Sequence, residues 1–473
     1  MSQDELCYWS ASALASAIAR KQLSPVEVLE AILDQIERLN PTLNAYCTVT
    51  AEQARQAAHE AEQRVMRGEP LGLLHGVPVL VKDTLWTAGV RTTMGSAIYA
   101  DFVPTEDAAV VARLKAAGAI LLGKTTTPEF AHKGMTDSPL FGVTRNPWSL
   151  AHTCGGSSGG AAAAVAAGMG PVGVGTDEGG SIRIPASFCG VVGLKPTFGL
   201  IPRFPIGRAE LLTHLGPLAR TVQDAALFLT ATAGRDDRDG CSLTNPSPDY
   251  IRELAEPVGE LRVAWSPTLG YAAVDPEVRR ITEAAVQVLL DLGWRVEQAD
   301  LGFADPARIA ETFSHPGLAA ILGEHLATWR ERMDPTLIVL VEDGQRMSAV
   351  DVACALFQRQ TLWERAYQFF QRYDLLVTPT VAVPPFAAGA PAPQAIAGQP
   401  ISRRGWIPFT YPFNLTGQPA ISIPCGWTAD GLPIGLQLVG RRLEDGLVLR
   451  AAAGFEAATR WADKHPALAL QPS

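Results

Sequence analysis

The chain has 473 residues, of which 47% are hydrophobic and 18% are charged, and its formal net charge is −9 at pH 7. This composition is typical of a globular protein, and the negative charge argues against nucleic acid or an anionic membrane as a bulk partner. The seven cysteines form no Cys-x-x-Cys pair, so the sequence predicts reduced thiols and no zinc cluster. The acidic N-terminus and the absence of an apolar run of about 20 residues predict a cytoplasmic protein without a membrane span.

The first part of the chain is predicted to be helical. Ser24 and Glu27 form a capping-box pattern around Pro25, which suits the first position of a helix, so a helix is expected over residues 25–39. A second helix is expected over residues 51–67, because this stretch is rich in Ala, Glu, Gln and Arg.

Apolar strand-like runs and amphipathic stretches then alternate along the chain. This alternation predicts an α/β fold in which a central β-sheet is covered on both faces by α-helices. The expected strands are residues 77–81, 119–122, 261–265, 375–378, 421–424 and 435–439, and the expected helices are residues 106–117, 159–168, 221–233 and 276–292.

No change in composition separates the motifs described below from the later strands, so we expect one large domain over residues 1–473. A turn-rich stretch, 234–257, is expected at the surface, and a Pro/Ala/Gly-rich loop, 384–400, is expected at the rim of a site. The expected parts of the domain are an N-terminal helical part (1–70), a catalytic motif core (71–235), a variable substrate-entrance region (236–400) and C-terminal core strands with a helix (401–457).

Two glycine–serine motifs and one lysine carry the chemistry. The run GTDEGGSIR ends at Arg183 and contains Ser181, the run GGSSGG contains Ser157, and Lys82 ends an apolar run. A serine is a poor nucleophile until a base takes its proton, and none of the eight histidines has a recognisable catalytic setting. Burial disfavours a lysine ammonium, so a buried Lys82 is the predicted base of a serine hydrolase.

In these motifs the chain resembles the amidase signature family. Lys82 in GVPVLVKD, Ser157 in GGSSGG and Ser181 in GTDEGGSIR match that family, as do the runs TRNPW, FCGVVGLKPTFG and FTYPFNLTGQPAISIP. The resemblance implies the amidase signature fold, in which the central β-sheet is mixed, and a catalytic triad of Lys82, Ser157 in a cis peptide and Ser181 as nucleophile. It also implies an acyl-enzyme reaction that needs no metal and no organic cofactor.

The resemblance further implies the surroundings of the triad. Asp177 and Arg183 are expected either to order the nucleophile loop or to form a routine local ion pair. Backbone N–H groups are expected to hold the oxyanion, and the residues implied are Glu178, Gly179, Gly180 and Ser181. Ser158 is also expected to support the catalytic residues. A low-polarity substrate pocket is expected at Met135, Trp406, Phe409 and Tyr411, with core packing of the aromatic residues as the alternative.

Glu178 departs from the family pattern, which usually has a small or uncharged residue before Gly-Gly-Ser. A carboxylate there would oppose an oxyanion unless it turns outward or pairs with a cation, or it could bind a polar or basic group of the substrate. Ile184 is a second departure, because the glutaminase subunits of amidotransferases generally have Gln after Ser-Ile-Arg. Both departures favour a stand-alone amidase.

The expected substrates are small-molecule amides, with apolar or aryl amides preferred and carbamates and aryl esters as side activities. No nucleic-acid or membrane partner is expected, and homodimers are common in the family. One alternative is the glutaminase subunit of a tRNA-dependent amidotransferase, and another is a catalytically silent binding or assembly protein. A nucleophile elbow with Ser157 as the attacking group would leave Ser181 and Lys82 unexplained.

Overall fold

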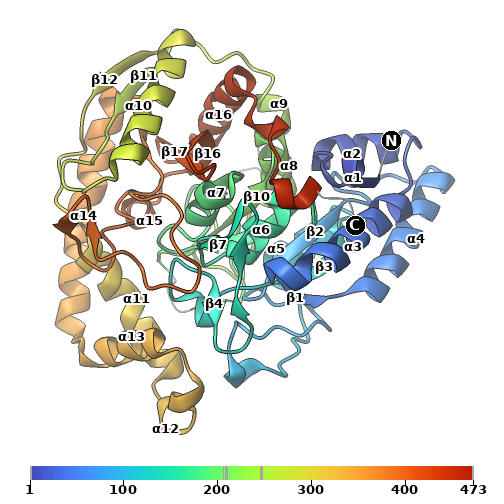
Figure 1. The fold of residues 1–473 in the computed structure, drawn as a ribbon, viewed down its shortest axis with the longest axis horizontal. Coiled ribbons are helices and arrows are strands. Elements are labelled where there is room, and N and C mark those ends of the chain that lie inside the picture. The colour runs from blue at the N-terminus through green and yellow to red at the C-terminus, as the bar shows by residue number, and fades with distance from the viewer. Residues whose placement is uncertain (1–2, 206, 208–210, 245–248, 471–473) are drawn as a thin grey trace.

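The computed structural model describes residues 3–205, 207, 211–244 and 249–470, and a sheet of eleven strands runs through these residues (Figure 1). Neighbouring strands are parallel in β3–β2–β8 and in β13–β11–β12, and the other neighbours are antiparallel. The sheet is therefore mixed, as predicted. In sheet order the strands are β1 (Tyr46–Val49), β3 (Ile120–Thr125), β2 (Pro78–Lys82), β8 (Val172–Asp177), β10 (His214–Ala219), β9 (Val192–Lys195), β16 (Ala420–Trp427), β17 (Pro433–Gly440), β13 (Leu375–Pro379), β11 (Arg262–Trp265) and β12 (Arg295–Gln298).

Helices cover both faces of this sheet, which confirms the predicted fold class. Ser187 on α7 packs at Gly435 of β17, whereas Val448 on α16 packs at Gly440 of the same strand. Residues five apart on a strand face opposite sides, so α7 and α16 lie on opposite faces. In chain order the helices up to α9 are α1 (Gln3–Cys7), α2 (Ala11–Ala19), α3 (Pro25–Leu43), α4 (Ala51–Arg67), α5 (Ala109–Ala116), α6 (Gly159–Ala166), α7 (Arg183–Cys189), α8 (Val222–Thr232) and α9 (Tyr250–Glu253).

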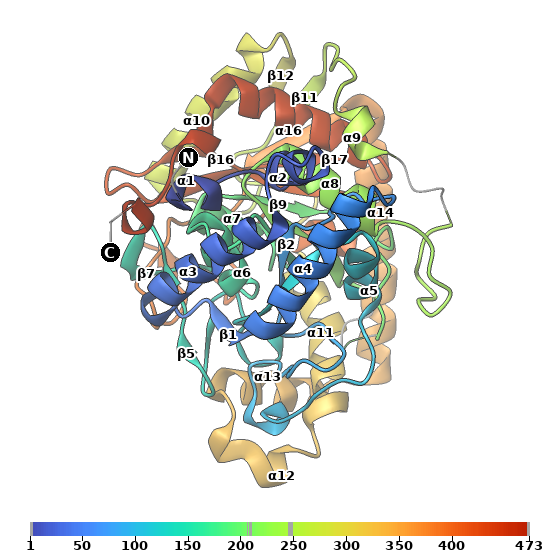
Figure 2. The same ribbon diagram turned by 90° about the vertical axis from the view of Figure 1, so that its right-hand side faces the viewer.

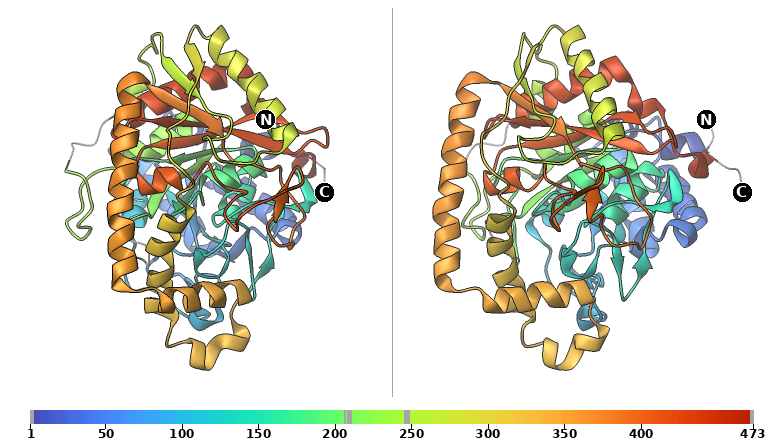
Figure 3. Two further views of the ribbon diagram at one scale, coloured as in Figure 1. Left: turned by 90° about the vertical axis from the view of Figure 1, so that its left-hand side faces the viewer. Right: turned by 60° about the vertical axis from the view of Figure 1, so that its left-hand side comes forward.

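A layer of helices borders the sheet at one edge, where the long helix α14 stands out in orange (Figure 3). Within it α11 and α13 share a small apolar cluster with Phe130, so this layer is attached to the core that carries the serine motifs. The remaining helices are α10 (Pro276–Asp291), α11 (Ala307–Leu322), α12 (Leu326–Trp329), α13 (Pro335–Arg346), α14 (Ala349–Arg372), α15 (Pro412–Leu415) and α16 (Asp445–Thr459). Short two-stranded pairs are β4 (Asp137–Ser138) with β5 (Gly142–Val143), β6 (Arg145–Asn146) with β7 (Ser149–Thr153), and β14 (Ala395–Ile396) with β15 (Gln399–Pro400).

The capping box predicted for α3 is present. The Ser24 hydroxyl accepts from the Val26 N–H at 3.0 Å, and the Ser24 N–H donates to the Glu27 carboxylate at 3.1 Å. The helix packs beside α4 (Figure 2) and continues beyond the predicted end at residue 39. It ends where Asn44 takes a left-handed φ of 53°, because the buried Leu43 holds the last turn against the core.

The helix predicted over residues 106–117 begins later, as α5 at Ala109. The Ala108 N–H donates to the Trp86 carbonyl and the Ala109 N–H donates to the Phe204 carbonyl. These contacts hold Ala108 extended, with ψ at 147°, so the helix cannot start before it.

Strands β8, β9 and β10 are not predicted by the sequence, because glycine weakens a strand pattern. Their glycines leave room for close neighbours: a Cβ at Gly173 would lie 2.0 Å from Leu80, and one at Gly193 would lie 2.6 Å from Ala186 of α7. Tertiary packing therefore fixes these strands where local propensity does not.

Glu456 on α16 gives the fold a pH dependence. It is partly buried and accepts a hydrogen bond from the Val222 N–H at 3.2 Å, at the start of α8. Burial raises the pKa of Glu456 from 4.5 to about 7. The pKa of Glu456 is higher in the folded protein than in the unfolded chain. The contribution of protonated Glu456 to stability is therefore full below pH 4.5 and is lost as the pH rises through 7.

We expect Glu456→Gln to be less sensitive to pH than the wild type. The amide keeps an acceptor for Val222 but does not ionise, so the wild type is expected to lose about 1–3 kcal/mol more stability than the variant between about pH 5 and 8. Denaturant unfolding across this pH range measures the difference. If the free energy of unfolding changed with pH in the same way for the two proteins, the assignment of this titration to Glu456 would be contradicted.

Candidate active site

The sheet brings the lysine and the nucleophile loop to one edge. Lys82 is the last residue of β2, which runs parallel to β8 with Val81 opposite Val174. Since the carboxyl ends of parallel strands meet at the same edge of a sheet, Lys82 lies beside the end of β8, where the run to Ser181 begins.

Lys82 is fully buried, and its Nζ lies within hydrogen-bond distance of three hydroxyl groups. These distances are 2.7 Å to Ser157 Oγ, 3.0 Å to Ser158 Oγ and 2.8 Å to Thr176 Oγ1. The structure therefore brings together Lys82, Ser157 and Ser158 and adds Thr176. The sequence signal for Thr176 was its place inside the motif, directly before Asp177.

The residues on either side of these groups fix their positions. The peptide bond between Gly156 and Ser157 is cis. The Ser158 N–H donates to the Ser181 carbonyl at 3.1 Å, which ties the two serine segments together. The neighbouring Asp83 carboxylate accepts hydrogen bonds from Thr93, at 3.1 Å from its N–H.

Ser181 lies where two cavities meet. A cavity of about 820 Å³ and a second of about 260 Å³ are both lined by Ser181 and Glu178, and the smaller is also lined by Ser157 and Thr176. A carbonyl group next to Ser181 therefore has space for a substituent on each side.

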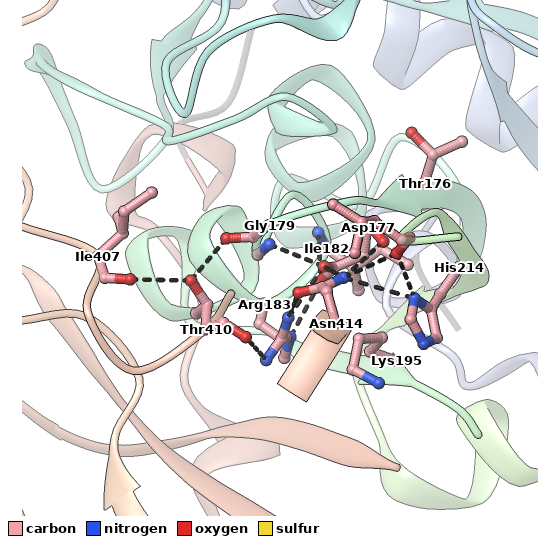
Figure 4. A network of polar contacts seen from close by, with 12 residues as sticks. Thr176, Asp177, Gly179, Ile182, Arg183, Lys195, His214, Ile407, Thr410 and Asn414 are labelled. Carbon is pink, nitrogen blue, oxygen red and sulfur yellow. Dashed lines mark hydrogen bonds and ion pairs between the residues drawn. The ribbon is translucent and has the colours of Figure 1, made fainter. Parts of the chain in front are cut away.

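A buried ion pair holds the loop between β8 and α7, the loop that contains Ser181 in the sequence (Figure 4). The Arg183 guanidinium donates to both oxygens of Asp177, at 3.0 and 2.9 Å, and both side chains are fully buried. Asp177 in turn accepts from the Gly180 N–H at 2.7 Å and from the Ile182 N–H at 3.2 Å. Asp177 and Arg183 are thus a buried ion pair and also order the nucleophile loop.

The network extends to residues far along the chain (Figure 4). The Asn414 amide donates to Asp177 at 2.8 Å and accepts from Arg183 at 2.7 Å. Arg183 also donates to the Thr410 carbonyl and to Gln437, at 2.9 and 2.8 Å. Although burial alone would raise the pKa of Asp177, Arg183 and Asn414 hold it well below its ordinary value of 3.8.

The loop amides differ in what they can offer to an oxyanion. The Gly180 N–H is already donated to Asp177, whereas the Gly179 and Ser181 N–H groups form no hydrogen bond within the described residues. Gly180 has a φ of 125°, and a Cβ there would lie 2.5 Å from the Thr410 hydroxyl. The glycine is needed both for its backbone conformation and for the close approach of Thr410.

The substrate-pocket residues expected from the sequence fall into two groups. Met135 and Trp406 line the larger cavity, but Phe409 and Tyr411 are fully buried and are not among its lining residues. Their segment faces the core because Thr410, between them, donates to the Gly179 carbonyl at 2.7 Å and so holds the backbone against the loop. Core packing therefore accounts for these two aromatic residues.

Other segments that line the two cavities had a weaker signal in the sequence. Residues 389–394 of the expected rim loop line the larger cavity, as do Thr336 and Leu340 of α13. The smaller cavity has a predominantly apolar lining that includes Trp86, Tyr99, Phe130 and Phe204.

No group of three or more His, Cys, Asp or Glu side chains suited to a metal ion occurs among the described residues. No two cysteines form a disulfide bond there. In the same part of the chain, no helix combines the length and the apolar character that crossing a membrane requires.

Comparison with known proteins gives the class of this protein. The family model described as Amidase matches residues 27–449, so the chain belongs to the amidase family, as its motifs predict. It is a hydrolase that acts on amide C–N bonds.

Particular relatives extend over nearly the whole chain. An acylamidase from Rhodococcus erythropolis is 42% identical over 477 residues, covering 99% of each chain. A glutamyl-tRNA(Gln) amidotransferase subunit from Moorella thermoacetica is 39% identical over 491 residues, covering 98% of this chain and all of the other. The crystal structure of a bacterial aryl acylamidase of the amidase signature family superposes with a TM-score of 0.92 at 32% identity, covering 98% and 99% of the two chains.

Proposed function

We propose that the protein is a stand-alone amidase that cleaves apolar or aryl amides through an acyl-enzyme on Ser181. The observation that carries this proposal is the 2.7 Å contact between the buried Lys82 Nζ and Ser157 Oγ, beside a cavity that Ser157 shares with Ser181. Two hydroxyl groups can relay a proton to a base that does not itself contact the nucleophile.

In the first half of the reaction, neutral Lys82 takes the proton of Ser157, and Ser157 takes the proton of Ser181. The Ser181 oxygen bonds to the amide carbon, and the carbonyl oxygen becomes an oxyanion. The N–H groups of Gly179 and Ser181 are donors for that oxyanion, because they form no hydrogen bond within the described residues, whereas Gly180 donates to Asp177. The proton on Lys82 then returns through Ser157 to the leaving nitrogen, and the C–N bond breaks.

In the second half, water attacks the ester formed on Ser181. The same lysine takes a proton from the water through Ser157 and returns it to Ser181 as the acid leaves. Ser158 and Thr176 act as positioning residues, because their hydroxyl oxygens fix Lys82 Nζ at 3.0 and 2.8 Å.

The preference for an aryl group rests on the smaller cavity. Trp86, Tyr99, Phe130 and Phe204 line it next to Ser157 and Ser181, so an aromatic ring can pack there while the rest of the substrate lies in the larger cavity. The names of two relatives, an acylamidase and an aryl acylamidase, agree with this class of substrate.

A second candidate function is that of a glutaminase within a larger amidotransferase. The glutamyl-tRNA(Gln) amidotransferase subunit from Moorella thermoacetica matches this chain over its full length at 39% identity. In that case glutamine would be the amide substrate, and activity would depend on partner proteins.

The test is a mass-spectrometric hydrolysis screen of the purified chain over anilides, aliphatic amides, carbamates, aryl esters and glutamine. We expect turnover of anilides that falls at least about 10³-fold in Ser181→Ala. Ser348→Ala, at the exposed N-cap of α14, is the matched control and is expected to retain wild-type turnover. Activity on glutamine alone, or no activity on any compound, would contradict the stand-alone amidase.

A further inference from the structure

Arg404 lies at the larger cavity, over the loop that carries Ser181. A Cβ built on Gly179 would lie 3.0 Å from Arg404 Nη1, so the guanidinium covers that glycine. Both residues line the larger cavity, and the Arg404 side chain is only 15% exposed. An arginine fork is therefore placed next to the position where the scissile carbonyl would bind.

Within the part of the chain that the structure describes, no group accepts a hydrogen bond from the side chain of this arginine. A guanidinium has five N–H donors, but the Arg404 side chain forms no hydrogen bond within the described residues, and its Nε is buried without a partner. Its contacts are a cation–π contact with Tyr411, at 5.7 Å from the ring centre, and the Glu311 carboxylate, 3.8 Å from Nε. N–H donors at a cavity wall that have no protein acceptor become unfavourable once a ligand excludes water from them, so the geometry favours an acceptor supplied by that ligand.

The charges around Arg404 indicate what kind of acceptor fits. Arg403 donates to Glu311 at 2.9 Å. Burial and the neighbouring Arg403 lower the pKa of Arg404, and Glu311 and Glu178 oppose this shift. Arg308 also lies 3.8 Å from Glu311, so this carboxylate is shared among three arginines. Glu311 and Glu178 both act on Arg404, and their negative charges would repel a further carboxylate brought next to it.

We propose that Arg404 is a specificity-determining residue that binds a neutral carbonyl oxygen, such as a second amide, on the part of the substrate in the larger cavity. This inference rests on the proposed function, because the scissile amide is the one bound at Ser181. Glu178 lines the same cavity, and its negative charge acts favourably on Arg404.

The experiment uses three anilides with acyl chains of equal length that end in a primary amide, in an isopropyl group or in a carboxylate. We expect the ratio of kcat/KM between the amide-ended and isopropyl-ended anilides to fall about 10–100-fold in Arg404→Met. Arg279→Met, which removes an exposed arginine that lines neither of the two cavities, is expected to change this ratio by less than about 3-fold. An equal ratio in the wild type and Arg404→Met would overturn the proposal, because loss of a merely structural residue would affect both substrates alike.

A binding measurement separates this proposal from the proposed function. In calorimetry, Ser181→Ala is expected to bind the amide-ended compound about 10–100-fold more tightly than the isopropyl-ended one without any turnover, and Ser181→Ala combined with Arg404→Met is expected to lose this preference. If the wild type hydrolyses none of the anilides but this preference is present, the proposed function fails and the Arg404 site stands. If the wild type prefers the carboxylate-ended compound, the choice of a neutral acceptor is overturned.

Discussion

Lys82→Ala is expected to lower kcat for an anilide by about 10³–10⁴-fold, and to lower kcat for the matched phenyl ester by only about 10–100-fold. The reason is the leaving group: an aniline nitrogen must be protonated as it leaves, whereas a phenoxide does not need a proton. In the proposed mechanism, the buried Nζ at 2.7 Å from Ser157 Oγ supplies this proton.

Steady-state kinetics on the anilide and the ester, which share one acyl group, measures this difference. Lys115→Ala is the control, since Lys115 is a partly exposed lysine that pairs with Asp107 at 2.8 Å, away from the site. Lys82→Met, which fills the same space, shows whether any loss in the alanine variant comes from a cavity. Equal losses on the amide and the ester in both Lys82 variants would contradict the role of Lys82 as the acid.

Arg183→Met is expected to lower the free energy of unfolding by about 3–5 kcal/mol and to abolish amide hydrolysis. The substitution leaves the fully buried Asp177 without its counter-ion, although Asp177 still accepts from the Gly180 and Ile182 amides. The loop that carries Ser181 is held by these hydrogen bonds, so loss of the ion pair is also expected to disturb the proposed oxyanion donors.

Denaturant unfolding at neutral pH measures the effect, and Arg262→Met is the matched control. Arg262 pairs with Asp374 at 2.8 Å, but its side chain is 50% exposed, so its loss is expected to cost only about 0–1 kcal/mol. The folded pKa of Asp177 is depressed, so its stabilising contribution is present above pH 3.8 and is lost as the pH falls through the folded pKa. If Arg183→Met lowered the free energy of unfolding as little as Arg262→Met does, the stabilising role of the Asp177–Arg183 ion pair in this loop would be contradicted.

The triad segments could be predicted from the sequence because their chemistry is written in contiguous runs. The strand that ends at Lys82 and the loop around Ser181 are local features, and their juxtaposition follows from two parallel strands ending at one edge. The position of Thr176 beside Lys82 could be inferred only from its place in the motif.

The partners of these segments could not be predicted, because they come from distant parts of the chain. Asn414 reaches Asp177 across 237 residues and Gln437 reaches Arg183 across 254 residues, and each contact depends on the order of strands in the sheet. Aromatic composition alone did not separate Trp406, which lines the larger cavity, from Tyr411, which packs in the core. The hydrogen bond from Thr410 that decides this orientation is visible only in three dimensions.

The most direct test of the account is to trap the acyl-enzyme. The wild-type protein is mixed with a slowly hydrolysed aryl carbamate and quenched during turnover, and its intact mass and peptide map are recorded. We predict a mass increase equal to the acyl group, located on Ser181 and absent from Ser181→Ala. An adduct on Ser157, or continued turnover without any adduct, would contradict a mechanism in which Ser181 attacks and Lys82 acts through Ser157.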